Sequence, residues 1–351
     1  MKERKFDLND IVLVPAESSD ISSRSECEIS CNGGSLPLMA SPMDTVVSKE
    51  NYTKYIDNGI IPCIPRGLAF EHLVGKPSYF QSFGLHDIEE SIRKYELYHD
   101  ELEYYDNDAF YQFPNILIDI ANGHMAKLIP IIQEIKRLWP NITLMVGNVA
   151  NPETFVNLAL AGADLIRCSV GTGAGCTTAA NVSINYPLGS LISECYEQRS
   201  HYDVKTKIVA DGGMRNYSDI IKALALGADY VMIGSIFNKS IESAGFNYLW
   251  KIRINNKIAE LLWRYDFPVK KKYRGMSTKA VQRSWGKTNL VTAEGITKYQ
   301  KVEYTLGQWI ENFKDYLRSA MSYCNAKNLN AFIGKAQYIF ITSEAKRRFE
   351  K

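Results

Sequence analysis

The chain has 351 residues, 46% of them hydrophobic, and a formal net charge of +2 at pH 7. This length allows one large domain or two ordinary ones with an ample core, and the near-neutral charge does not require a nucleic acid or a membrane as partner. No apolar run is long enough to span a membrane, and the N-terminal MKERKFDLND lacks the apolar core of a signal peptide.

The seven cysteines and five histidines show no metal-binding spacing. The cysteine count is odd and no C-x-x-C occurs, which predicts a protein of a reducing compartment, the cytoplasm, without a zinc cluster. The histidines form no H-E-x-x-H motif.

Short apolar runs alternate with helical patterns along most of the chain. The candidate strands are Leu36–Ala40, Ile60–Ile64, Tyr79–Phe83, Ile116–Ile120, Thr143–Val146, Leu165–Ser169, Ile208–Ala210 and Tyr230–Ile233. Runs of this length, buried on both faces, are typical of parallel strands. Helical patterns include Lys127–Leu138, Pro152–Gly162 and Ser218–Gly227, with Ser218 as the expected N-cap. Eight such alternations predict a (β/α)₈ barrel, and a doubly wound open sheet is the alternative.

Polar or glycine-rich motifs follow six of these runs. They are Ser41–Asp44, Asp119–His124, Gly147–Ala150, Gly171–Thr178, Asp211–Gly213 and Gly234–Ser235. In a (β/α)₈ barrel the carboxyl ends of the strands meet at one rim, which carries the active site. Any one motif alone could be an ordinary turn, but six at the same rim predict a functional site.

The stretch Leu165–Thr178, LIRCSVGTGAGCTT, carries the strongest chemical signal. Three closely spaced glycines let the backbone approach a ligand, and successive N–H groups can form an anion-binding concavity. A thiol beside such a concavity can be held as the thiolate, which is the nucleophilic form. The alternative is an ordinary turn beside a buried cysteine. We interpret the loop as a phosphate or purine cradle with Cys176 as nucleophile.

The loops after the last two strands often hold phosphate in this fold. Gly212, Gly213, Gly234 and Ser235 offer backbone N–H groups and a hydroxyl, and Asp211 can accept hydrogen bonds from ribose hydroxyls. Phosphate together with ribose implies a nucleotide or a sugar phosphate.

The pattern loosens after the eighth strand. The basic stretch Lys270–Ser277 is expected to be a solvated linker or a segment that closes over an anion, and Gln282–Gly295 a mobile polar loop that carries Glu294. Trp309–Ala326 is expected to be a closing helix, and the charged tail Thr342–Lys351 to be frayed. The acidic, tyrosine-rich stretch His86–Asp108 is expected to be a solvated helix and loop.

Seven stretches together resemble the IMP dehydrogenase/GMP reductase family along nearly the whole chain. They are FDLNDIVLVPA, SPMDTV, GNVA, the Cys176 loop, ADGG, VMIGS and YRGMS. The resemblance implies a (β/α)₈ barrel over residues 1–351 without an inserted regulatory domain. It also implies a purine nucleotide as partner, a cysteine that attacks carbon 2 of the purine, a nicotinamide cofactor, and a homotetramer.

Carried onto this sequence, the resemblance implies roles for residues at the rim. The catalytic residues would be Cys176, Thr178 and Glu294, and Asp119, Asn122 and Asn148 would bind the cofactor. Nucleotide binding is assigned to a larger set, namely Asp211, Gly213, Gly234, Ser235, Tyr273, Met276 and Ser277. A monovalent cation such as K⁺ would lie at the carbonyls of Gly171, Gly173 and Cys176.

Within the family, DIANGH, the short loop before Glu294 and the Cys-Thr-Thr run favour a GMP reductase that uses NADPH. SPMD and KKYRGM are closer to an NAD-dependent IMP dehydrogenase, in which Arg283 would be the base, although Ser284 stands where a tyrosine is expected. Ala174 and Ala179 depart from the family pattern. Because of these two departures, two further alternatives stay open: the protein could bind a nucleotide without efficient catalysis, or its substrate could be a modified purine nucleotide.

Overall fold

The computed structural model describes residues 4–31, 33–68, 79–98, 112–284, 289, 292 and 294–349. Its strands are β1 Ile11–Leu13, β2 Leu38–Ala40, β3 Ile61–Ile64, β4 Phe80–Phe83, β5 Asn115–Asp119, β6 Thr143–Val149, β7 Leu165–Cys168, β8 Lys207–Asp211, β9 Tyr230–Ile233, β10 Asn247–Leu249, β11 Ile252–Ile254, β12 Val269–Arg274, β13 Thr297–Lys301 and β14 Tyr338–Phe340. Its helices are α1 Tyr52–Asp57, α2 Leu85–Tyr98, α3 Leu128–Leu138, α4 Pro152–Leu160, α5 Thr178–Val182, α6 Leu188–His201, α7 Tyr217–Leu226, α8 Ser235–Asn238, α9 Asn256–Arg264, α10 Lys279–Ser284, α11 Leu306–Tyr323, α12 Leu329–Phe332 and α13 Ser343–Phe349.

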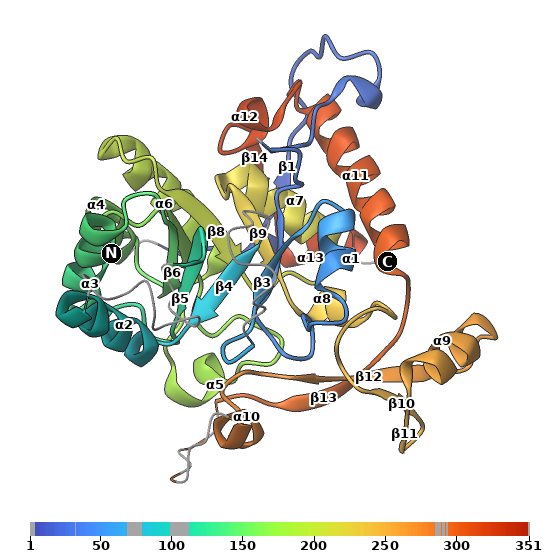
Figure 1. The fold of residues 1–351 in the computed structure, drawn as a ribbon. Coiled ribbons are helices and arrows are strands. Elements are labelled where there is room, and N and C mark those ends of the chain that lie inside the picture. Colours follow the sequence, from blue (N-terminus) through green and yellow to red (C-terminus); the bar gives the residue numbers. More distant parts are fainter. Residues whose placement is uncertain are drawn as a thin grey trace.

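Strands β2 to β9 form a closed parallel barrel (Figure 1). All eight predicted runs are confirmed as its strands. The last strand pairs with the first, with Met39 opposite Met232, so the alternative of an open doubly wound sheet is wrong. Side chains such as Met39, Leu117 and Met145 fill the barrel interior, and a larger apolar core lies between the strands and the surrounding helices.

The helices begin where side chains can satisfy free backbone N–H groups. At α4 the Asn151 side chain accepts hydrogen bonds from the N–H groups of Glu153 and Thr154. The predicted cap of α7 was wrong by two residues, because Asn216 and not Ser218 accepts the hydrogen bond from Asp219 N. The closing helix α11 likewise starts before the predicted Trp309, because Thr305 and Gln308 form a capping box.

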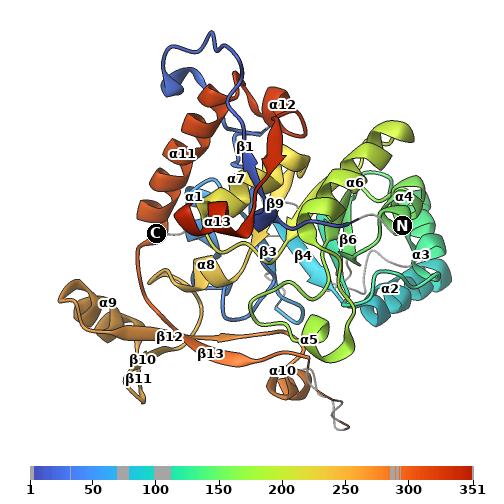
Figure 2. The ribbon, with the colours of Figure 1, turned by 180° about the vertical axis from the view of Figure 1, so that it is seen from behind.

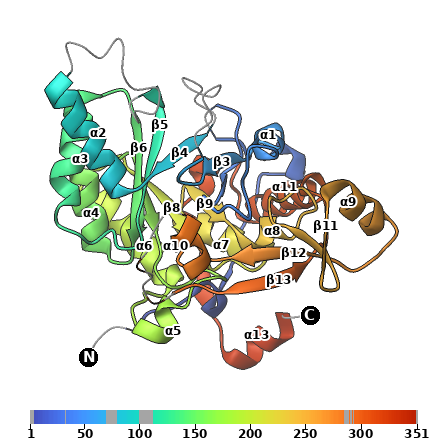
Figure 3. The same ribbon diagram turned by 60° about the horizontal axis from the view of Figure 1, so that its bottom comes forward.

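A second sheet lies beside the barrel and has the strand order β11-β10-β12-β13 (Figures 1 and 3). It corrects the expectation of a linker at Lys270–Ser277, because most of that stretch is strand β12. Val269, Lys271 and Tyr273 alternate with more exposed residues along β12, so one face of the strand is buried. Sequence reasoning missed this strand because lysines occupy positions that a buried strand usually fills with apolar residues.

Strand β1, near the start of the chain, pairs with β14, near its end, in antiparallel fashion (Figures 1 and 2). The ring of Phe6 packs edge-on against that of Phe340, with the ring centroids 5.0 Å apart. The tail was expected to be frayed, but it forms α13 up to Phe349. Residues 99–108 of the acidic stretch and much of the loop before Glu294 lie outside the described residues, whereas 85–98 form the predicted helix α2.

Candidate functional site

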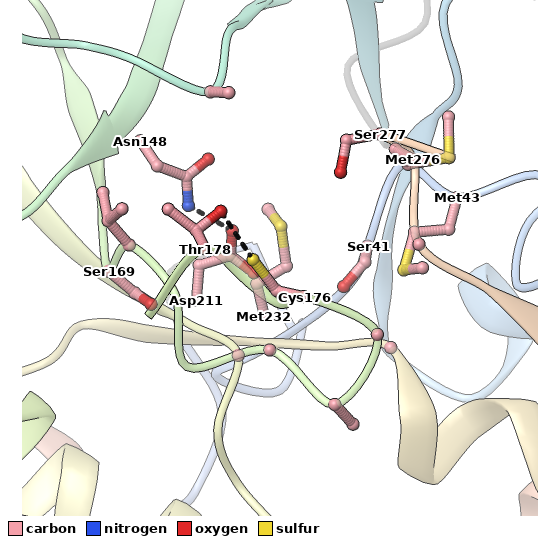
Figure 4. Close-up of a pocket in the computed structure, with 18 of the residues that line it drawn as sticks. Ser41, Met43, Asn148, Ser169, Cys176, Thr178, Asp211, Met232, Met276 and Ser277 are labelled. Atoms are coloured by element: carbon pink, nitrogen blue, oxygen red, sulfur yellow. Dashed lines mark hydrogen bonds between the residues drawn. The ribbon is translucent and has the colours of Figure 1, made fainter. Parts of the chain in front are cut away.

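A cavity of about 410 Å³ opens at the carboxyl ends of the barrel strands. All six rim motifs contribute to its lining, as does the segment after β12 (Figure 4). The lining includes every residue expected to be catalytic or to bind the nucleotide, namely Cys176, Thr178, Glu294, Asp211, Gly213, Gly234, Ser235, Tyr273, Met276 and Ser277. The tertiary structure therefore brings these predicted residues to one place.

The glycines of the loop between β7 and α5 are needed where other segments come close. Gly171 has a φ of +81°, and a Cβ there would lie 2.9 Å from the Cβ of Ala179. At Gly175 a Cβ would lie 3.0 Å from the Tyr273 ring, while the Gly175 carbonyl accepts a hydrogen bond from Ile296 N at 3.0 Å. A side chain at Gly175 would press against Tyr273 and the Gly275 backbone, and Ala179 provides the small surface that Gly171 packs against.

Cys176 begins a short chain of hydrogen bonds that ends at a carboxylate. Its Sγ donates to Thr178 Oγ1 at 3.2 Å, and the Thr178 hydroxyl donates to Glu294 Oε2. The Glu294 backbone carbonyl also accepts a hydrogen bond from Thr177 N at 2.8 Å. A thiol, a hydroxyl and a carboxylate are therefore connected in one line, along which a proton can be passed.

The opposite wall of the cavity combines backbone and polar groups. At Gly234 a Cβ would lie 3.2 Å from Tyr273 Oη and 3.3 Å from Ser41 Oγ, so a side chain there would fill the space between them. Burial, with the nearby Asp211 and Cys176, raises the pKa of the Tyr273 phenol above its ordinary value. The Tyr273 hydroxyl thus stays protonated and can donate a hydrogen bond to a ligand.

A charged network lines the mouth of the barrel, and sequence reasoning missed its centre. Arg167 lies on β7 with its side chain 8% exposed, and it donates to Asp119 Oδ1 at 2.6 Å and to Asp211 Oδ2 at 2.7 Å. Arg66 Nε contacts the other oxygen of Asp119 at 3.2 Å, and Asn148 Nδ2 donates to Asp211 Oδ2 at 2.7 Å. Burial alone would lower the pKa of Arg167, but the two carboxylates more than offset it and raise the pKa above its ordinary value.

One signal in the sequence could have pointed to this network. Arg167 stands inside the apolar run LIRC, and a buried guanidinium is stable only when carboxylates and hydrogen bonds compensate its charge. Asp119 and Asp211, already singled out at the same rim, are those carboxylates. The network connects the residue expected at the cofactor with the residue expected at the nucleotide.

Two of the three residues expected at the cofactor, Asp119 and Asn148, line the cavity. Asn122 does not, and its side chain instead accepts a hydrogen bond from His124 N at 3.1 Å. At the expected cation site, the Gly173 carbonyl accepts a hydrogen bond from Cys176 N at 2.8 Å. In the ranges that the structure describes, no group of three or more His, Cys, Asp or Glu side chains could hold a metal ion.

Arg283, the alternative base, lies on α10 with an exposed side chain. It is not among the described residues that line the cavity, whereas its neighbour Gln282 is.

Among the helices of the described ranges, none has the length and apolar character needed to cross a bilayer.

Comparison with known proteins gives consistent results. A family model described as the IMP dehydrogenase / GMP reductase domain matches residues 111–349. The chain is 31% identical to inosine-5'-monophosphate dehydrogenase of Chlorobaculum parvum over 232 residues, which cover 66% of this chain and 46% of that protein. It is 26% identical to GMP reductase of Caenorhabditis elegans over 97% of this chain and 93% of that protein, and 26% identical to mouse GMP reductase 1 over 97% and 96%.

The fold and the site define a (β/α)₈-barrel protein with a cysteine-centred ligand cavity at the carboxyl ends of its strands. The family match covers more than half of the chain, so the chain belongs to the IMP dehydrogenase/GMP reductase family. It spans about half the length of the dehydrogenase relatives it matches and more than nine tenths of the two reductases named above.

Proposed function

We propose that this protein is a GMP reductase-like enzyme that converts GMP to IMP, with NADPH as the hydride donor. The observation that carries the proposal is the hydrogen-bonded line from Cys176 through Thr178 to Glu294, inside the cavity. The similarity to two GMP reductases over 97% of the chain supports the same reading.

The reaction begins when the Cys176 thiol passes its proton through the Thr178 hydroxyl to the Glu294 carboxylate, and the resulting thiolate forms a bond to carbon 2 of GMP. Glu294 supplies a proton through the Thr178 hydroxyl to the exocyclic amino group, the bond between carbon 2 and that nitrogen breaks, and ammonia leaves. The dihydronicotinamide supplies a hydride to carbon 2 when it is bound. The bond to Cys176 then breaks, which regenerates the thiolate and releases IMP.

The remaining residues hold the reactants in place, which supplies proximity. Asp211 would accept hydrogen bonds from the ribose hydroxyls, and the backbone of Gly213, Gly234 and Ser235 would hold the phosphate. Asp119 and Asn148 fit a cofactor, because they lie in the same cavity as Cys176. Arg66 and Arg167 hold the Asp119 carboxylate in place through hydrogen bonds to its two oxygens.

The proposal is tested by mixing the protein with GMP and NADPH, and separately with IMP and NAD⁺, while nicotinamide absorbance is followed. Loss of absorbance with GMP, accompanied by ammonia release, is the expected result. Absorbance gained only with IMP would replace the proposal with the dehydrogenase alternative. If neither mixture changes the nicotinamide absorbance while calorimetry detects GMP binding, the protein would be a nucleotide-binding protein without turnover.

The second candidate, IMP dehydrogenase, rests on the 31% identity to the Chlorobaculum enzyme over the shared 232 residues. It requires a base that activates water. Arg283 would have to turn into the cavity for this role, because its side chain is exposed and outside the described lining. For this reason we favour the reductase.

A further inference from the structure

The interior of the barrel carries a layer of charged side chains between its apolar filling and the catalytic cavity. The apolar filling includes Leu117, Leu165 and Val209. Because side chains alternate along a strand, the residues two positions further on point into the same interior, one layer closer to the rim. These residues are Asp119 on β5, Arg167 on β7 and Asp211 on β8, and all three line the cavity.

Strand β6 lies between β5 and β7 in the barrel and leaves room for the arginine. A Cβ at Gly147 of β6 would lie 2.5 Å from the Cβ of Arg167, which is too close for two side chains to coexist. Without a side chain there, the guanidinium can extend across β6 to Asp119, while Asp211 lies on the neighbouring strand β8. One arginine thus reaches two carboxylates that lie three strands apart.

The two carboxylates are held in different ways. Asp211 Oδ2 accepts hydrogen bonds from Arg167 Nε at 3.1 Å, from Arg167 Nη2 at 2.7 Å and from Asn148 Nδ2 at 2.7 Å (Figure 4). Within the described part of the chain, no protein group donates a hydrogen bond to its other oxygen, Oδ1. Asp119 has one donor on each oxygen, Arg167 Nη1 at 2.6 Å and Arg66 Nε at 3.2 Å. Both carboxylates therefore keep acceptor positions for a ligand.

Among the described residues, Arg167 alone donates hydrogen bonds to both carboxylates. Its side chain is 8% exposed, so water has little access to take its place as a donor. Two carboxylates left in this layer without the shared cation would repel each other strongly, because the surroundings screen charge poorly. Lysine is no equivalent, since only the planar guanidinium offers donors in a fixed fork that can bind two partners at once.

We propose that Arg167 is a positioning residue for both ligands: it presents Asp211 Oδ1 to the ribose of the nucleotide and holds Asp119 toward the cofactor. The inference rests on the proposed function, which assigns one carboxylate to each ligand. It adds that a single guanidinium, without touching either ligand, sets both affinities. Loss of Arg167 should therefore weaken the binding of nucleotide and cofactor, each through its own carboxylate.

The test measures ligand binding by calorimetry, so it does not depend on turnover. GMP is titrated into the protein alone, and NADP⁺, which has no hydride to give, into the protein with excess GMP. Arg167→Met is expected to lower both affinities by about 10–100-fold, as when each ligand loses one hydrogen bond to a charged group. The matched control is Arg199→Met, which removes a partly buried ion pair with Asp229 outside the described cavity lining and should leave both affinities unchanged.

Double-mutant cycles show whether Arg167 acts through the two carboxylates. In the Asp211→Asn background, Arg167→Met should change the affinity for GMP by less than about twofold, yet still lower the affinity for NADP⁺. In the Asp119→Asn background the pattern should reverse. An arginine with a merely structural role would weaken both ligands in every background, and that result would overturn the inference. Each double variant loses one charge of either sign, so the cycles carry the test if circular dichroism shows that Arg167→Met alone does not fold.

Arg167→Lys keeps the charge but loses the fork. Its ammonium can still reach Asp211 on the neighbouring strand, so the affinity for GMP should recover more than that for NADP⁺. Equal recovery of both would show that charge alone matters and would exclude the positioning role. If the protein binds IMP and NAD⁺ but not GMP and NADP⁺, the reductase proposal fails, and the same cycles with IMP and NAD⁺ decide the inference. A protein that binds neither pair contradicts both.

Discussion

Cys176 is positioned both by its neighbours in sequence and by a segment more than a hundred residues away. Its N–H is bound to the Gly173 carbonyl, while Glu294 reaches it through the Thr178 hydroxyl and through Thr177 N. The six other cysteines lie outside the cavity lining within the described ranges, and burial raises the pKa of Cys27, Cys31, Cys63, Cys195 and Cys324. Cys176 is therefore the one thiol among the described residues that line the cavity.

Cys176→Ala is expected to abolish turnover, because no other thiol in the described cavity can bond to the purine. Nucleotide affinity should stay within about tenfold, or roughly 1.4 kcal/mol, because Asp211 and the glycine loops remain. Steady-state kinetics and calorimetry with GMP measure the two quantities. Cys195→Ala, at a buried cysteine on α6, is the matched control and should keep the activity. Residual turnover of Cys176→Ala above the background rate would remove this residue from the mechanism.

The second prediction separates the two directions of chemistry. Glu294→Gln keeps the shape and the hydrogen bond of the side chain but cannot supply a proton. Ammonia release in a single turnover should therefore fall by about 10²–10⁴-fold, the usual range for general acid catalysis. Arg283→Ala should change the rate little, since the exposed Arg283 lies outside the described lining. The opposite result, a large defect in Arg283→Ala beside a near-normal Glu294→Gln, would argue for IMP dehydrogenase.

At the scale of elements, strand β12 connects the small core under α9 to the catalytic cavity. The strand starts at Val269 in the small core under α9 and reaches Tyr273 at the cavity four residues later. Lys271 lies between them, 1% exposed, and its Nζ donates to the carbonyl of Ser243 at 2.5 Å and to that of Gly245 at 3.4 Å. The lysine thus fixes β12 on the segment that follows α8.

Lys271 predicts a pH-dependent stability. Burial lowers its pKa to about 8 from an ordinary value of 10.5. Between these pH values the unfolded chain binds a proton that the folded chain does not, so the free energy of unfolding rises with pH, by up to about 3 kcal/mol. Below pH 8 both states are protonated and this contribution is absent.

The measurement is urea unfolding at pH 7.5 and at pH 10, for the unaltered protein and for Lys271→Met. Other groups that titrate in this range, the tyrosines above all, contribute to both proteins and cancel in the comparison. The unaltered protein should gain more stability from the rise in pH than the variant. Equal gains would show that Lys271 titrates normally in the folded state.

At the scale of the whole molecule, the cavity lies between the barrel and the second sheet, and residues of both line it. The barrel supplies Cys176 from the loop after β7 and Asp211 from the end of β8, while the β12–β13 sheet supplies Tyr273 and leads to Glu294. Glycines allow the two parts to approach each other closely, since a Cβ at Gly275 would lie 2.4 Å from the Gly175 carbonyl oxygen. A ligand in the cavity should therefore stabilise both parts at once.

We expect GMP at 100 times its Kd to raise the free energy of unfolding by about 2.7 kcal/mol. Calorimetry should show one transition that moves to higher temperature, and amide exchange should slow at Tyr273 to Ser277 as well as at the barrel rim. In Asp211→Asn the side chain should bind the ribose more weakly, so the increase in transition temperature at the same GMP concentration should be smaller. Protection limited to the barrel, with Tyr273 unaffected, would exclude the second sheet from the nucleotide site.

The sequence by itself determined the eight barrel strands and the rim motifs. Apolar runs of strand length alternate with helical periods, and the chain reverses at the carboxyl end of each strand, so the motifs had to share one rim. The sequence also indicated Cys176, because this thiol follows three closely spaced glycines at the end of a predicted strand. These inferences rest on local patterns, which are visible without any contact between distant segments.

Only the tertiary structure decided which distant charges and surfaces meet. In the sequence, Arg167 is a single charged residue within an apolar strand. Its partners Asp119 and Asp211 are 48 and 44 residues away, so the sequence does not show that they compensate its charge. The basic residues of β12 were predicted to form a linker, because the side chains and carbonyls that stabilise them belong to segments far away in the sequence. The pairing of β1 with β14 and the small core between α9 and β12 could not be predicted for the same reason. Long-range contacts stabilise them, and such contacts leave no periodic pattern in the sequence.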